Sequence, residues 1–258
     1  MNDLRLSIVQ TTLVWENPSA NFKKFEELIH PLSGKTDIIV LPEMFTTGFS
    51  MNAERLYDAP NGKTLHWLKQ QAKLTNAAIT GSAIIKDQDD YYNRLFFVEP
   101  DGTFYTYDKK HLFTLAGEHK HYTAGSERLV VNYKGWRICP LICYDLRFPV
   151  WARYKGDYDC LIYVANWPER RIQAWDTLLK ARAIENMSYC VGVNRTGKDG
   201  NDYPYIGHSA IYDVLGQSVS TADFEKEFVD TQVLSYDALS GAREKLGFLN
   251  DRDDFELR

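Results

Sequence analysis

Covalent chemistry in this chain could come from four cysteines, Cys139, Cys143, Cys160 and Cys190. Only the thiolate form of cysteine is a good nucleophile, and the free thiol has a pKa of about 8.5, so a catalytic cysteine needs a group that removes its proton. A carboxylate can take that proton and later return it to a departing amine. A lysine ammonium can stabilise both the thiolate and the oxyanion of a tetrahedral intermediate. A glutamate, a lysine and a cysteine in one cleft would therefore hydrolyse a small C–N bond without a histidine or a metal.

Three predicted strands end beside residues of these types. The continuous apolar run 37–41 ends just before Glu43, the run 103–107 ends just before Lys109, and the run 136–142 ends at Cys143. In open α/β sheets, ligand sites form at the carboxyl ends of the strands. We therefore expect Glu43, Lys109 and Cys143 at one edge of the sheet structure. The other three cysteines are expected to be reduced, buried core residues.

Strand and helix patterns alternate along the chain, which is typical of a layered α/β protein. No linker, low-complexity stretch or internal repeat divides the sequence, so we predict one domain over residues 1–258, with a charged C-terminal arm from about residue 235. Further strands are expected at 4–9, 78–85, 160–164 and 189–194, and hairpins at 94–107 and 129–142. Helices are expected from residue 18 and at 64–74, 149–153 and 174–186. A Gly- and Asp-rich loop is expected after residue 194, followed by β-rich sequence at 208–234.

Composition narrows the possible classes of function. The net charge is −5 and the pI is about 5.7, and no basic run is present, which argues against binding to a nucleic-acid backbone. No segment has the apolar length of a membrane span, and residues 1–5 do not begin a signal peptide. We expect a cytoplasmic enzyme that acts on a small molecule.

Three short motifs choose among the many acids and lysines of the chain. The segments 41–45 (LPEMF), 107–112 (YDKKHL) and 143–149 (CYDLRFP) resemble, in this order, the signature segments of the nitrilase, or carbon–nitrogen hydrolase, superfamily. The segments 117–119 (GEH) and 181–186 (ARAIEN) agree with it. The resemblance extends from residue 4 to about residue 234. It implies a four-layer α-β-β-α sandwich, no cofactor and no metal, and a homodimer formed through the face that carries the late helix.

The resemblance also implies the roles of individual residues. Glu43 would be the general base and then the acid. Lys109 and the backbone N–H of Tyr144 would stabilise the oxyanion. Cys143 would form a thioester and release ammonia. Glu118 would orient the lysine and the amine.

Within the superfamily the chain is most similar to the omega-amidases, which hydrolyse the terminal amide of 2-oxoglutaramate or 2-oxosuccinamate. Arg147 could bind the distal carboxylate of such a substrate in a bidentate manner. Phe45, Phe49 and Trp167 could form the pocket wall, and Asn166 would lie beside it. Some omega-amidases have tyrosine where this chain has Phe49, which removes one hydroxyl donor and leaves the exact substrate open.

Several alternatives stay open. Arg147 could instead fix the loop after the nucleophile through a salt bridge, and Glu118 could be an ordinary loop residue. Lys110 is expected at the surface. His111, His119 and His121 could suggest a metal site or a cysteine–histidine dyad, although surface or hydrogen-bonding roles are commoner for such residues. The substrate could also be an N-carbamoyl amino acid, an aliphatic amide or a nitrile, and a catalytically silent binding homologue is the non-enzymatic alternative.

Overall fold

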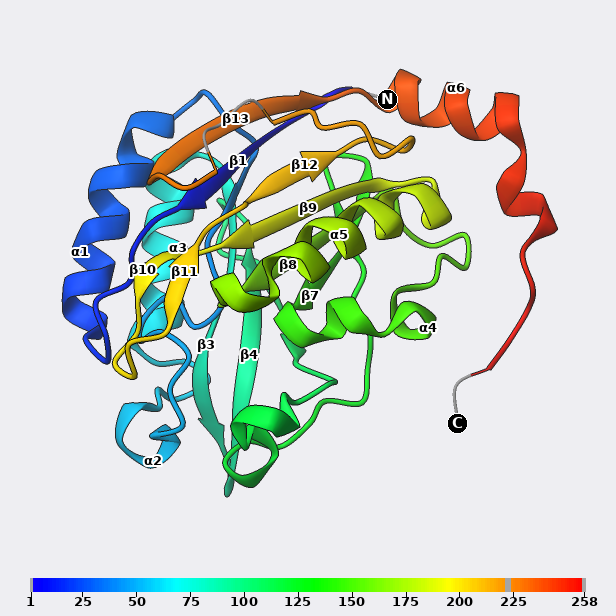
Figure 1. Ribbon diagram of the computed structural model, residues 1–258. Helices are drawn as coiled ribbons and strands as arrows, with labels where there is room; N and C mark the ends of the chain where they lie inside the picture. Colours follow the sequence, from blue (N-terminus) through cyan, green and yellow to red (C-terminus); the bar gives the residue numbers. More distant parts are fainter. Residues whose placement is uncertain (1, 221–223, 257–258) are drawn as a thin grey trace.

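The computed structural model describes residues 2–220 and 224–256, and the two large sheets of this part of the chain pack face to face (Figure 1). The first sheet has six strands in the order β13-β1-β2-β3-β4-β5, and the second has five in the order β12-β9-β8-β7-β6. The first sheet contains β1 (Leu4–Gln10), β2 (Ile38–Val40), β3 (Ala78–Asp87), β4 (Asp90–Val98), β5 (Phe104–Asp108) and β13 (Phe228–Leu234). The second contains β6 (Val131–Tyr133), β7 (Trp136–Ile142), β8 (Cys160–Ala165), β9 (Tyr189–Asn194) and β12 (Ala210–Tyr212).

Helices cover the outer face of each sheet. Helices α1 (Pro18–Ile29) and α3 (Lys63–Thr75) lie on the first sheet, and α5 (Ile172–Asn186) lies on the second (Figure 1). The short helices α2 (Ala53–Leu56) and α4 (Pro149–Ala152) belong to the connections. The expected four-layer α-β-β-α sandwich is confirmed.

The strand β2 shows why its sequence is apolar without interruption. Ile38 and Val40 belong to the core between the two sheets, whereas Ile39 belongs to the core between the first sheet and its helices. Successive side chains of a strand point to opposite faces, so a strand covered on both sides needs apolar residues at every position.

The expected start of α1 is also confirmed. The side chain of Asn17 accepts a hydrogen bond from the backbone N–H of Ala20 at 3.1 Å, and Pro18 occupies the first helical position. These are the residues preferred at a helix N-cap and at the first helical position. Phe25 and Ile29, one turn apart, are buried against the first sheet.

Two predictions of local structure were wrong. The strand expected from residue 94 begins at Asp90, because β3 and β4 are joined by a tight turn in which Gln88 adopts a positive φ of 56°. The expected Gly- and Asp-rich loop after residue 194 is a hairpin of β10 (Thr196–Lys198) and β11 (Pro204–Ile206). Its turn is closed by the Asp199 carboxylate, which accepts the backbone N–H groups of Asn201 and Tyr203.

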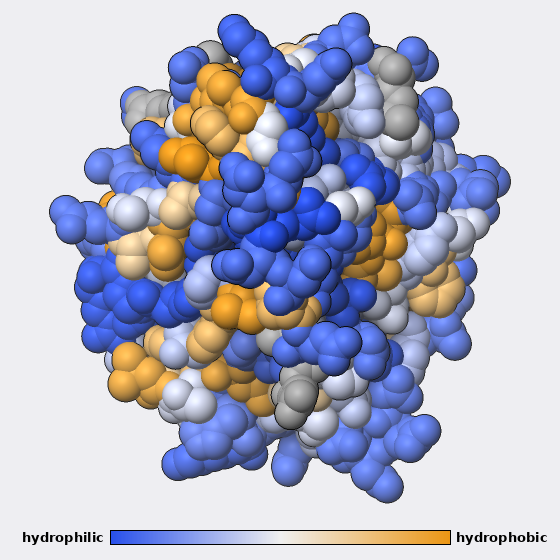
Figure 2. All heavy atoms as spheres, turned by 90° about the vertical axis from the view of Figure 1, so that its right-hand side faces the viewer, coloured by the Kyte–Doolittle hydropathy of each residue, from blue (hydrophilic) through white to orange (hydrophobic). Residues whose placement is uncertain are grey.

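After β13 the chain forms α6 (Tyr236–Leu246) and then an irregular C-terminal segment, as expected for the residues beyond 235. The side of the molecule that carries α6 is largely hydrophilic, with apolar residues in several separate patches (Figure 2). Among the described residues, no helix combines the length and the apolar character that crossing a membrane would require.

Candidate active site

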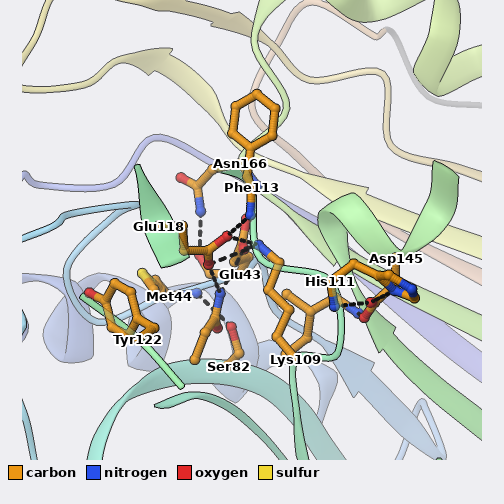
Figure 3. Close-up of polar contacts among 12 residues, drawn as sticks. Glu43, Met44, Ser82, Lys109, His111, Phe113, Glu118, Tyr122, Asp145 and Asn166 are labelled. Atoms are coloured by element: carbon orange, nitrogen blue, oxygen red, sulfur yellow. Dashed lines mark hydrogen bonds and ion pairs between the residues drawn. The ribbon is translucent and has the colours of Figure 1, made fainter. Parts of the chain in front are cut away.

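The ends of β2, β5 and β7 bring three distant side chains together at one edge of the sandwich. Lys109 directly follows β5, Cys143 directly follows β7, and Glu43 comes three residues after β2. The Nζ atom of Lys109 lies 2.9 Å from Oε1 of Glu43 (Figure 3). Both Lys109 and Cys143 line the same cavity. The structure therefore places the predicted acid, ammonium and thiol at a single site.

The Glu43 carboxylate is fully buried and held by donors from three elements. Besides Lys109, the side-chain amide of Asn93 in β4 donates to Oε1 at 2.8 Å, and the backbone N–H of Asn166 after β8 donates to Oε2 at 2.8 Å. The Asn166 side chain also donates to the backbone carbonyl of Glu43 at 2.6 Å. These bonds fix the position and orientation of the carboxylate.

Glu118 completes this buried group. Its two oxygens each lie 3.0 Å from Nζ of Lys109, and its Oε1 accepts a hydrogen bond from Asn93 at 3.3 Å. Burial alone lowers the pKa of Lys109, but Glu118 and Glu43 outweigh burial and raise that pKa. Lys109 therefore stays an ammonium ion. Burial raises the pKa of Glu118, and Lys109 opposes this shift.

Cys143 begins the 3-10 helix that follows β7. Its φ is +44°, in the left-handed region that non-glycine residues rarely adopt. Such conformations persist only where the surrounding structure holds them, and they cluster at active sites. Only 9% of Cys143 is exposed. Burial, and then the charge of Glu43, raise the pKa of its thiol well above the ordinary value, while Lys109 lowers it.

A cavity of about 510 Å³ opens above Cys143 and Lys109. Its wall contains the predicted binding residues Phe49, Tyr144, Arg147, Asn166 and Trp167. The guanidinium of Arg147 lies 5.0 Å from the centre of a Trp167 ring and makes no ion pair with another described residue. This placement favours a binding role for Arg147 over the alternative of a salt bridge that fixes the loop.

The prediction that Phe45 lines the pocket was wrong. Its ring is fully buried on the other side of the first sheet, 5.6 Å from the rings of both Phe25 and Trp67. The reason is local: Met44 has a positive φ of 42°, which reverses the chain after Glu43. The side chain of Phe45 consequently points toward α1 and α3 instead of the cavity.

Several residues of the site were missed from the sequence. Asn93 lies in β4 but directly before the strand expected from residue 94, so no sequence pattern indicated that its side chain faces the site. The hairpin β10–β11 supplies part of the cavity wall, and its sequence looked like an ordinary loop. The missed wall residues include Phe113, Arg170, Arg171, Asp199, Tyr203 and Tyr205.

Among the residues that the structure describes, no three His, Cys, Asp or Glu side chains are grouped so that they could hold a metal ion. His111 hydrogen-bonds Asp145, and His119 and His121 are exposed on the loop beside Glu118. Lys110 is half-buried, with Nζ 5.4 Å from the centre of a Trp151 ring. The neighbours of Cys143 in the site are Glu43 and Lys109, which leaves the histidine dyad without geometric support.

Comparison with known sequences gives a consistent result. The profile of the carbon–nitrogen hydrolase family matches residues 5–238. Omega-amidase YafV of Yersinia enterocolitica is 46% identical over 257 residues, which cover 100% of both chains. The 2-oxoglutaramate amidase of Bacillus subtilis is 36% identical over 234 residues, which cover 88% of this chain and 90% of the relative.

Comparison with solved structures extends the likeness to the fold. A carbon–nitrogen hydrolase superfamily protein of Xanthomonas campestris, which carries an arsenic adduct in its active site, superposes with a TM-score of 0.97. It is 44% identical, and the match covers 100% of both chains. Nit3 of Saccharomyces cerevisiae is 23% identical with a TM-score of 0.86, covering 95% of this chain and 94% of its own, and shares the fold.

Proposed function

This chain belongs to the carbon–nitrogen hydrolase family, and we propose that it is an omega-amidase. Such an enzyme hydrolyses the terminal amide of small 2-oxo acid amides such as 2-oxoglutaramate and 2-oxosuccinamate. The observation that carries the proposal is that Lys109, Cys143 and Arg147 line one cavity, with the buried Glu43 carboxylate bound to the Lys109 ammonium. The first three residues can break a C–N bond, and the arginine can select a substrate with a carboxylate.

In the first half-reaction, Glu43 accepts the proton of the Cys143 thiol, and the sulfur attacks the amide carbon. The carbonyl oxygen then carries the negative charge, next to the ammonium of Lys109 and the backbone N–H of Tyr144. As the C–N bond breaks, Glu43 gives its proton to the nitrogen and ammonia leaves. The acyl group remains on Cys143 as a thioester.

In the second half-reaction, water replaces ammonia beside Glu43. Glu43 removes a proton from the water. The water oxygen attacks the thioester carbon, and the C–S bond breaks. The sulfur takes back its proton and the acid is released. Glu43 thus serves as base and acid in turn, which suits a carboxylate held rigidly by three donors.

Lys109 is suited to stabilise the oxyanion because its ammonium group has one N–H bond left for the substrate. An ammonium group has three N–H bonds. One is directed to Glu43, and one can be shared between the two oxygens of Glu118. The third is then available to a carbonyl oxygen bound above Cys143.

The charge of the cavity wall supports an anionic substrate. Arg147, Arg170 and Arg171 all line the cavity, and Phe49, Tyr144 and Trp167 provide aromatic surface between them. A guanidinium can bind a carboxylate through two parallel hydrogen bonds. Arg147 is assigned this role because it follows the nucleophile by four residues and lines the cavity together with Trp167.

The proposal also covers assembly and location. The four cysteines are free thiols, which fits a cytoplasmic enzyme. We expect a homodimer through the face that carries α5. On that face Ile184 is 49% exposed and packs against the turn at Gly216, next to Leu215, which is 52% exposed.

Replacing the nucleophile tests the reaction. Cys143→Ala should abolish ammonia release from 2-oxoglutaramate while the circular dichroism spectrum stays unchanged. Cys139→Ala is the matched control, because Cys139 is a buried cysteine of β7, the strand that precedes Cys143, and does not line the cavity. This control should keep its activity with a stability loss of about 1 kcal/mol. Substantial ammonia release by Cys143→Ala would refute the assigned mechanism. Separately, assays of the native protein on neutral amides and nitriles, compared with 2-oxoglutaramate, distinguish the substrate classes.

A further inference from the structure

The proposed mechanism needs Lys109 and Cys143 at a fixed separation, yet these residues belong to different sheets. Lys109 follows β5 at the edge of the first sheet, and Cys143 follows β7 in the second. The two sheets touch mainly through apolar side chains, which resist separation but do not define position to a fraction of an ångström. A directional contact between the two segments would supply that definition.

Asp145 makes such a contact. It lies two residues after Cys143 and is fully buried. Its Oδ2 atom accepts the hydroxyl of Tyr107 at 2.7 Å and the backbone N–H of Ile142 at 3.0 Å. Its Oδ1 atom accepts the backbone N–H of His111 at 3.0 Å and the His111 ring Nδ1–H at 2.7 Å (Figure 3).

The partners of Asp145 surround both catalytic positions in the sequence. Tyr107 and His111 lie two residues before and two residues after Lys109, and Ile142 directly precedes Cys143. One carboxylate therefore binds the lysine segment on both sides and closes the tight turn of the nucleophile. Tyr107 is itself held, because its oxygen accepts the indole N–H of Trp151 at 3.1 Å.

The four donors require a carboxylate at this position. An ionised aspartate only accepts hydrogen bonds, and each of its oxygens has two donors here. An asparagine has the same shape but would turn an N–H₂ group toward one pair of donors. Neither Tyr107, His111 nor Asp145 lines the cavity, so these residues do not bind the substrate.

We propose that Asp145, with Tyr107 and His111, is a positioning residue that sets the distance between the Lys109 ammonium and the Cys143 sulfur. We call these three residues the Asp145 joint. The inference rests on the proposed use of Lys109 and Cys143, and it concerns a residue that acts through both of them. Loosening the joint slows the chemical step and leaves substrate binding nearly unchanged.

Two substitutions of His111 test the joint with little risk to folding, because the His111 side chain is 22% exposed. His111→Leu removes the ring donor, whereas His111→Asn keeps a donor near the position of Nδ1. Both lose the stacking of the ring on Phe148, so their difference isolates the hydrogen bond to Asp145. We expect kcat to fall about 10-fold in His111→Leu and to stay within about twofold in His111→Asn, with KM within about threefold in both.

Asp145→Asn tests the centre of the joint. We expect kcat to fall about 100-fold, and the alkylation of Cys143 by iodoacetamide to slow and to need a higher pH, because Lys109 no longer supports the thiolate. The alkylation rate does not depend on the substrate, so it tests the joint even if the proposed amide is wrong. Asp159→Asn is the control. Asp159 is also a buried aspartate, paired with Arg137 and Arg243, but it lies just before β8, whereas the site residue Asn166 lies just after that strand. It should lower Tm without changing kcat or the alkylation rate.

The joint is refuted if His111→Leu and His111→Asn have equal kcat and equal alkylation rates. It is equally refuted if folded Asp145→Asn matches the native protein in both measurements. Should Asp145→Asn fail to fold, the pair of His111 variants decides the question alone.

Discussion

Cys143, the proposed nucleophile, has surroundings that favour the neutral thiol until a substrate is bound. Burial and the Glu43 charge raise its pKa, and Lys109 is the group that lowers it. The proton is therefore expected to leave for Glu43 in the same event as the attack on the amide. This arrangement would protect the thiol from oxidation between turnovers, since oxidation follows the thiolate fraction.

Lys109→Met tests the electrostatic part of this account. Removing the ammonium raises the thiol pKa further, so less thiolate is present at any pH below that pKa, and it also removes a donor to the oxyanion. We expect kcat to fall about 10²- to 10³-fold. In the free enzyme, the curve of alkylation rate against pH should move to higher pH. A shift to lower pH would contradict the sign of the interaction between Lys109 and Cys143.

Arg147→Lys tests how the substrate is recognised. Lysine keeps the positive charge but cannot form two parallel hydrogen bonds with a carboxylate. We expect kcat/KM for 2-oxoglutaramate to fall at least about 10-fold, which corresponds to about 1.4 kcal/mol. A neutral amide of similar size should lose less than about twofold, and steady-state ammonia assays give both values. Equal losses on the two substrates would assign Arg147 to the structure of the loop.

The strands and turns are tied to each other by buried carboxylates as well as by apolar contacts. Asp37, at the start of β2, accepts the backbone N–H of Arg5 in β1 at 2.8 Å and pairs with the Arg5 guanidinium. It also pairs with Lys134 in the turn between β6 and β7. One carboxylate thus joins two strands of the first sheet to a hairpin of the second.

Asp37 gives a prediction about stability against pH. Burial raises its pKa, but hydrogen bonds from Arg5 and Lys134 outweigh burial and lower the pKa to about 2. Because the folded state binds this proton less readily than the unfolded state, the stabilisation is present above about pH 4 and is lost as the pH falls toward 2. Asp37→Asn should cost about 1–2 kcal/mol at pH 7, after allowance for the exposed partners, and almost nothing at pH 2. Urea unfolding at several pH values measures both; an equal loss at every pH would contradict the prediction.

Both helix layers of the four-layer sandwich lie on its outside, and either could form the proposed dimer interface. The arrangement of exposed apolar residues differs between the two layers. The face of α5 carries Ile184 and, at the neighbouring turn, Leu215. The end of α3, on the opposite face, carries Leu74, which is 54% exposed. Apolar residues scattered singly need no partner, whereas adjacent exposed ones favour an interface.

Ile184→Glu tests the dimer and its location. A charge buried at the centre of an interface is costly, so the mass measured by analytical ultracentrifugation at micromolar concentration should fall from that of two chains to that of one. Leu74→Glu should leave the mass unchanged. A dimer that persists in Ile184→Glu but dissociates in Leu74→Glu would place the interface on the other helix layer.

The layered α/β class, and the sheet edge at which Glu43, Lys109 and Cys143 lie, could be predicted from the amino-acid sequence. These features depend on local patterns: apolar runs define strands, and residues just after the ends of the strands fall at the edge of a sheet. The motifs around the three residues then distinguished them from the other acids, lysines and cysteines. The cap of α1 was predictable for the same reason, since Asn17 and Pro18 act within one turn of helix.

Which side chains share the site depends on the folded chain and could not be predicted from local patterns. Asn93 lies 50 residues from Glu43 in sequence, and only the pairing of β2 with β3 and of β3 with β4 brings them together. Phe45 turned away because a single positive φ at Met44 reverses the side on which the next residue lies. Asp145, which follows a strand of the second sheet, accepts hydrogen bonds from Tyr107 and His111, which flank the end of a strand of the first sheet. No local sequence pattern predicts how the two sheets pack. Side-chain direction and contacts between distant segments depend on the whole packed chain, whereas strand ends depend on their neighbours alone.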